Sequence, residues 1–131
     1  MREKPLILIV DDEKDLREIM FTKLVASGFD AAVAYDGTEA VNAARTIHPD
    51  LILMDIHMPG PSGTDAALVI KQTPETKDIK IAFLSNMKDP WPQTMAPRNT
   101  LAQAIGMEDF IDKTEDLDLT VKKVREILAR R

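Results

Sequence analysis

The sequence of 131 residues contains no cysteine, and this absence excludes several classes of site at once. A disulfide-stapled fold, a thiolate metal centre and a cysteine nucleophile all need thiols. Long apolar runs are missing too, because the longest, Leu6–Val10, is far short of the roughly 20 residues that a membrane-spanning helix needs. The G-x-x-x-x-G-K-[ST] pattern of P-loop nucleotide enzymes is also absent. We therefore expect neither a membrane partner nor P-loop chemistry.

Positive charge is in deficit, since 17 Lys and Arg face 22 Asp and Glu for a net charge of -5. This balance argues against direct contact with nucleic acid. Met1–Lys4 leads into only five apolar residues and then acids, which is unlike a signal peptide. The length fits one domain of the usual size, about 100–150 residues. We expect a single cytoplasmic domain over residues 1–131, with no output domain in this chain.

Apolar runs and helical stripes alternate along the chain. Gly28 stands where a helix end favours a left-handed residue, and Pro49 and Pro74 each follow a helical pattern. The patterns predict strands over 6–10, 29–34, 51–54 and 79–84 and a short fifth strand around 110–111, with helices over 12–26, 39–47, 64–72 and from 117 onward. Such alternation predicts an α/β fold with a parallel sheet covered on both faces. Residues 85–97 contain three prolines and form the one irregular stretch.

Polar residues follow four of the predicted strands. In an open parallel sheet, ligands bind at the carboxyl ends of the strands. The residues at these ends are Asp11 and Asp12, Asp55, Ser85 and Asn86, and Asp112 and Lys113. The sequence therefore predicts that these side chains gather at one edge of the sheet.

Each of these residues also has an ordinary structural explanation. Asp11 or Asp12 would serve as a helix cap, Ser85 as a turn residue and Lys113 as a solvated lysine. Asp55 is harder to explain in this way, because it closes an apolar run where an unpaired carboxylate is costly. The joint occurrence of all of them favours a functional site.

The predicted cluster has a definite chemistry. Three carboxylates repel one another, and a hard cation such as Mg²⁺ relieves that repulsion. One carboxylate can then attack a phosphoryl group and form an acyl phosphate. The metal and one lysine would supply positive charge to the phosphoryl oxygens, and the hydroxyl of Ser85 would hydrogen bond to one of them.

With these residues in place, the sequence resembles the receiver domain of response regulators, the phospho-acceptor module of two-component signalling. The resemblance covers nearly the whole chain, and its main segments are LILIVDDE at 6–13 and PDLILMDIHMPG at 49–60, with Gly63 at the matching later position. It implies a flavodoxin-like, doubly wound, five-stranded parallel sheet of strand order 2-1-3-4-5 with five helices.

The resemblance also assigns roles to single residues. Asp55 would be phosphorylated, and Asp12 and Asp55 would bind Mg²⁺ directly. The remaining assignments are Asp11 as a ligand through water, the backbone carbonyl of His57 as a direct ligand, Ser85 as the switch hydroxyl with Asn86 beside it, Lys113 as the phosphoryl-contacting lysine and Phe110 as the switch aromatic.

The sequence departs from the family pattern in three places. Thr114 follows Lys113 where the family usually has proline, and a cis bond before a non-proline residue costs about 2.5–4 kcal/mol, so we expect a trans bond. Asn86 is larger than the usual residue after the switch hydroxyl, which would restrict access to the phosphoryl group. The stretch from Ser85 to Lys113 is also longer than the family pattern.

The resemblance implies a switch rather than an enzyme. A histidine kinase or phosphotransfer protein would phosphorylate Asp55, and Ser85 and Phe110 would then alter the face of the fourth helix, fifth strand and fifth helix, where a downstream protein binds. Self-phosphorylation and slow autodephosphorylation would be its only catalysis. A pseudo-receiver that binds proteins without phosphorylation is the main alternative. A dehalogenase-type phosphatase would need a second acid where His57 stands, and an FMN phosphate would be repelled by the acids at 11–13.

Overall fold

The computed structural model describes residues 3–56, 63–85, 109–113 and 116–130, although the side chains of Ser85, Asp109 and Phe110 are outside the described part. Within these ranges the chain forms five strands and four helices. The strands are β1 (Leu6–Val10), β2 (Asp30–Ala34), β3 (Leu51–Asp55), β4 (Lys80–Ser85) and β5 (Asp109–Asp112). The helices are α1 (Lys14–Ala26), α2 (Gly37–Ile47), α3 (Gly63–Gln72) and α5 (Leu117–Ala129). The fifth helix that the resemblance implies would fall in 86–108, outside the described residues.

The strands form one parallel sheet in the order β2-β1-β3-β4-β5, as predicted. Each strand pairs in parallel with its neighbour, with Val10 beside Met54 and Asp55 beside Leu84. The strand order reverses at β1, so β1 and β3 flank the point where ligands bind in flavodoxin-like folds. The carboxyl ends of β1 and β3 therefore lie level with each other.

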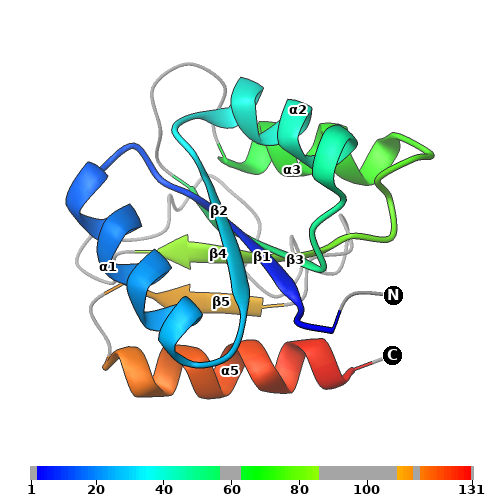
Figure 1. Cartoon of the computed structure of the whole chain (residues 1–131). Helices are drawn as coiled ribbons and strands as arrows, with labels where there is room; N and C mark the ends of the chain where they lie inside the picture. The colour runs from blue at the N-terminus through cyan, green and yellow to red at the C-terminus, as the bar shows by residue number, and fades with distance from the viewer. Residues whose placement is uncertain (1–2, 57–62, 86–108, 114–115, 131) are drawn as a thin grey trace.

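Helices cover both faces of the sheet (Figure 1). Side chains alternate between the two faces along a strand, so Leu8 and Val10 pack under α2 and α3 while Ile7 and Ile9 pack under α1 and α5. All four of these side chains are fully buried. The central strands are apolar throughout because both of their faces are covered.

Local sequence signals set the helix ends. Gly28 follows α1 with a φ of 99°, a conformation that favours glycine, and its N–H donates to the Val25 carbonyl. Asp36 caps α2, because its carboxylate accepts a hydrogen bond from the Glu39 N–H at 2.8 Å. Gly28 therefore has the local role that the sequence pattern predicts, and the structure adds Asp36 as the cap of α2.

Most strand and helix bounds differ from the sequence patterns by one or two residues, and two differences concern α1. The first helix begins at Lys14 rather than Asp12, because Asp11 and Asp12 belong to the turn that follows β1. The apolar spacing in 12–26 places Leu16, Ile19, Met20 and Leu24 on one stripe, but Ile19 is half exposed whereas Met20 and Leu24 are buried. No helix in the described part of the chain is both long and apolar enough to cross a membrane.

Candidate functional site

Asp11, Asp55 and Lys113 meet at the carboxyl edge of the sheet. Val10 pairs with Met54, so Asp11 follows β1 level with the last residue of β3, Asp55. Asp55 pairs with Leu84, and Ser85 pairs with Asp112, so Lys113 follows β5 near the same level. The parallel register alone thus brings together residues more than forty positions apart in sequence.

Asp11 is fully buried and held at several points. Its N–H donates to the Ala34 carbonyl at 3.2 Å, which ties it to the end of β2. Its Oδ1 accepts a hydrogen bond from the Glu13 N–H at 2.8 Å, and this bond shapes the turn before α1. Helix α1 has no side-chain cap, so Asp11 orders the turn rather than capping the helix.

Asp55 is the last residue of β3 and is only 2% exposed. The start of α3 packs directly against it, because the Gly63 N–H donates to the Ile56 carbonyl at 3.1 Å. A β-carbon added to Gly63 would overlap the Asp55 carbonyl oxygen and lie 2.8 Å from its carbonyl carbon. Only glycine allows this close approach, which explains why glycine stands at position 63.

Lys113 forms ion pairs with both buried carboxylates. Its Nζ lies 3.0 Å from Asp11 Oδ2 and 2.9 Å from Asp55 Oδ2. Burial by itself lowers the pKa of Lys113, but the hydrogen bonds and negative charges of Asp55 and Asp11 outweigh it and raise the pKa above 10.5. Lys113 therefore remains charged across the physiological pH range and partly compensates the buried acids.

The carboxylates also fit a divalent cation. Asp11, Asp12 and Asp55 each place one oxygen within 4.8 Å of the others. Asp12 is exposed while the other two are buried, so the group opens toward solvent. Lys113 pairs with two of these carboxylates, and a group of hard oxygen donors of this kind suits Mg²⁺.

The remaining predicted site residues are placed only in part. Phe110 lies inside β5, as the strand pattern predicts, whereas Ser85 is the last residue of β4 rather than the residue after it, and the side chains of both are outside the described part. His57, Asn86 and the irregular stretch up to residue 97 also lie outside the described residues. The Lys113–Thr114 bond leads to a residue that is not described. The roles assigned to these residues stay predictions.

Sequence patterns did not single out Arg17. Its Nη1 donates to the backbone carbonyl of Asp11 at 2.7 Å, and its guanidinium lies 4.7 Å from the centre of the Tyr35 ring. The sequence shows only that Arg17 lies in the first turn of the helix that follows Asp11. A cation at such a position is too common to indicate a site.

With this geometry established, comparison with known proteins identifies the family. The response regulator receiver domain family matches residues 7–125. The chain belongs to that family. The match spans the three aspartates and Lys113, so the receiver resemblance of the sequence is confirmed.

Curated relatives include larger proteins. The DNA-binding response regulator MtrA of Mycolicibacterium paratuberculosis is 33% identical over 130 residues, covering 99% of this chain and 50% of MtrA. The sensor kinase/phosphatase CqsS of Vibrio cholerae is 36% identical over 123 residues, covering 94% of this chain and 17% of CqsS. This chain thus spans half the length of MtrA and a smaller part of CqsS.

Solved structures share the receiver fold. The chemotaxis protein CheY4 of Vibrio cholerae superposes with a TM-score of 0.82 at 22% identity, covering 95% of this chain and 98% of CheY4. The receiver domain of a histidine kinase from Syntrophus aciditrophicus superposes with a TM-score of 0.81 at 26% identity, covering 95% of this chain and 90% of that chain. The flavodoxin-like fold class is therefore confirmed for this receiver domain.

Proposed function

We propose that this receiver domain accepts a phosphoryl group on Asp55 and uses the resulting acyl phosphate as a signalling state. The observation that carries the proposal is the pairing of Lys113 with both Asp55 and Asp11 at the strand ends. We choose Asp55 over Asp11 as the nucleophile because both carboxylate oxygens of Asp11 already have contacts, with Glu13 N–H and with Lys113, and because the receiver resemblance assigns the phosphoryl group to Asp55.

The proposed reaction is a direct phosphoryl transfer. A carboxylate oxygen of Asp55 attacks the phosphorus, and the bond from phosphorus to the donor's leaving atom breaks with its electron pair going to that atom. The negative charge on the phosphoryl oxygens would then compete with Asp11 for the Lys113 ammonium. The hydroxyl of Ser85, at the end of β4 next to β3, is proposed to contact a second phosphoryl oxygen.

Asp11, Asp12 and Asp55 would hold Mg²⁺, together with the backbone carbonyl of His57 that the family pattern implies. When bound, the ion would reduce the repulsion between the carboxylates and the incoming phosphoryl group. Asp12 would be the ligand most open to exchange because it is exposed, while Asp11 is fixed by its backbone and turn hydrogen bonds.

The proposed partners follow from the same chemistry. A histidine kinase or a phosphotransfer protein would donate the phosphoryl group in the cytoplasm, and a downstream protein would read the phosphorylated state. Phosphorylation would act stoichiometrically, so we propose self-phosphorylation and slow autodephosphorylation rather than turnover of an external substrate. The proposed output face is the one that the resemblance implies, formed by the fourth helix, β5 with Phe110, and α5.

Intact mass spectrometry after incubation with acetyl phosphate and Mg²⁺ tests the proposal. The wild-type chain should gain one phosphoryl mass, and Asp55→Asn should gain none. Asp50→Asn is the matched control, because Asp50 lies just before the opposite end of β3 and its carboxylate accepts a hydrogen bond from Leu6 N–H. An amide oxygen preserves that bond, so the control should label like the wild type.

Labelling of Asp55→Asn to the wild-type extent would reject the assignment. A wild-type chain that binds Mg²⁺ but takes no phosphoryl group from acetyl phosphate or from a histidine kinase would instead support the pseudo-receiver alternative.

A further inference from the structure

We infer that Arg17, braced by Tyr35, is a positioning residue that holds the acidic turn in the geometry needed for a divalent cation. The inference rests on the proposed phosphoryl-acceptor function, because it concerns how the same acidic site is held. Arg17 lies on α1, Tyr35 directly follows β2, and the atom that Arg17 contacts belongs to Asp11 at the end of β1. Three elements thus converge on one backbone carbonyl.

The contact fixes the backbone of the residue whose side chain enters the site. The Arg17 Nη1 donates to the Asp11 carbonyl at 2.7 Å, a charge-assisted hydrogen bond, and this carbonyl leads directly into Asp12. Asp11 Oδ1 is already held by Glu13 N–H and its N–H by Ala34. Arg17 is therefore the contact that restrains the peptide joining the buried acid to the exposed one.

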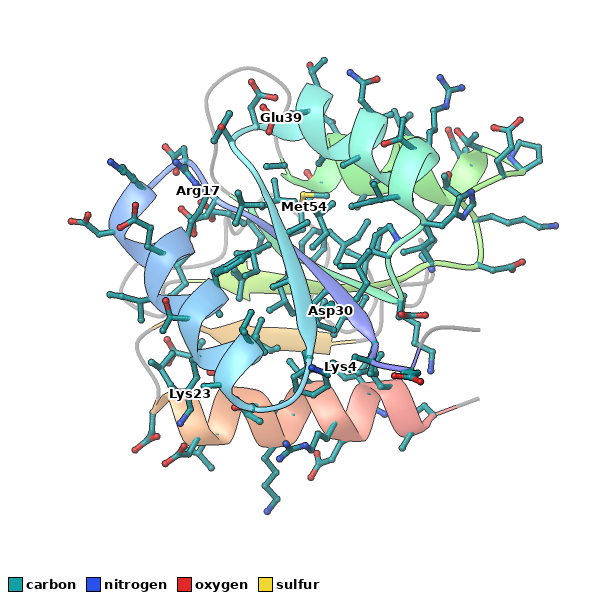
Figure 2. All side chains as sticks on the ribbon, in the orientation of Figure 1. Lys4, Arg17, Lys23, Asp30, Glu39 and Met54 are labelled. Carbon is teal, nitrogen blue, oxygen red and sulfur yellow. The ribbon has the colours of Figure 1, made fainter. Side chains whose placement is uncertain are left out.

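Tyr35 restrains the guanidinium in turn. The ring centre lies 4.7 Å from the Arg17 Cζ, so the flat faces of both groups limit where the arginine can point. Arg17 is half-buried whereas Tyr35 is 55% exposed, so the ring lies on the solvent side of the guanidinium. The guanidinium itself contacts the turn at Asp11. Figure 2 shows Arg17 at the upper end of α1 and Lys23 at the lower end, next to α5.

The opposite end of α1 carries a chemically matched pair that does not touch the site. The Arg125 Nη2 donates to the Ser27 carbonyl at 2.7 Å, and its guanidinium lies 5.5 Å from the centre of the Phe29 ring. Both arginines therefore join an aromatic ring to a backbone carbonyl at an end of α1. Only Arg17 does so beside the acidic cluster, so Arg125→Met separates general stabilisation from positioning.

The test is calorimetric titration of the full chain with MgCl₂, alongside urea unfolding of each variant. Arg17→Met should weaken Mg²⁺ binding about tenfold, the size expected for loss of an outer contact to a metal ligand. Tyr35→Leu should weaken it about threefold, the size of an exposed cation–π contact. The double variant should be no weaker than Arg17→Met, because both residues act through one contact. Arg17→Lys, which keeps a charged donor, should recover most of the affinity.

Arg125→Met should bind Mg²⁺ like the wild type even if it unfolds at a lower urea concentration. Wild-type affinity in a folded Arg17→Met, or an equal loss in Arg125→Met, would overturn the inference. If Arg17→Met does not fold, Tyr35→Leu and Arg17→Lys decide the matter, and wild-type affinity in Tyr35→Leu would overturn it. Failure of the wild-type chain itself to bind Mg²⁺ would reject the proposed metal site, which is a separate result.

Discussion

Lys113 carries the charge balance of the site. It is the cation that contacts both buried carboxylates, and its own side chain is only 11% exposed. A buried ion pair adds little to the free energy of unfolding compared with an apolar replacement of both partners. Removing one partner is costly, however, because it leaves the other charge buried and uncompensated. The consequences of losing the lysine or its charge are therefore large, and both can be measured.

Lys113→Met should lower the free energy of unfolding of the metal-free chain by about 3 kcal/mol, because Asp11 and Asp55 would lose their shared cation. Urea denaturation measures this. Lys23→Met is the matched control, since Lys23 pairs with the largely exposed Asp118 and such pairs contribute about 0–1 kcal/mol. Equal losses in the two variants would contradict the assignment of Lys113 to a buried pair.

The stability that Lys113 contributes should depend on pH in the alkaline range. Its pKa in the folded chain lies above 10.5, so the contribution is fully present below 10.5 and is lost as pH rises through the folded value. Other groups titrate there too, so the quantity to measure is the stability difference between wild type and Lys113→Met. That difference should shrink above pH 10.5, and a constant difference would show that the lysine charge is not responsible.

At the scale of elements, the contact between β3 and α3 fixes the backbone of Asp55, the proposed nucleophile. Gly63 begins α3 against the backbone of Asp55, where there is no room for a side chain. Gly28, which ends α1, has open space around its missing β-carbon and needs glycine only for its backbone conformation. The two glycines therefore allow the effects of crowding and of backbone conformation to be compared.

Gly63→Ala should lower the free energy of unfolding by about 3 kcal/mol, because the new methyl group would force apart the strand and helix that form the site. It should also reduce phosphoryl uptake by the folded fraction, since Asp55 would move. Gly28→Ala should cost about 1 kcal/mol and leave uptake unchanged. Circular dichroism melts and intact mass measure the two effects, and unchanged uptake in folded Gly63→Ala would contradict the positioning role.

The elements show what sequence patterns can predict. The apolar runs at 6–10 and 51–54 predicted β1 and β3 because strands covered on both faces must be apolar throughout. The predicted start of the first helix, residue 12, was wrong by two residues. The Asp11 carboxylate accepts a hydrogen bond from the Glu13 N–H and holds residues 11–13 in a turn, and the apolar pattern did not show this. Arg17 and Tyr35 were missed for a related reason, since their contact depends on how β2 and α1 pack.

At the scale of the whole molecule, the parallel topology brings three distant polar segments of the described chain into one site. The order β2-β1-β3-β4-β5 brings Asp11, Asp55 and Lys113 together, and their strand-end positions were predictable from the sequence alone. The bridging geometry of Lys113 was not, because it depends on the register of β5 against β4. His57, Asn86 and the stretch up to residue 97 lie outside the described residues, so the roles assigned to them stay predictions.

The proposed function requires that Asp55 itself becomes an acyl phosphate. Borohydride reduces an acyl phosphate to an alcohol, so a phosphorylated aspartate becomes homoserine, which peptide mass spectrometry can locate. After treatment with acetyl phosphate and Mg²⁺, we predict homoserine at position 55 alone and none when Mg²⁺ is omitted. Homoserine at position 11 or 12, or no homoserine in a chain that binds Mg²⁺, would contradict the account.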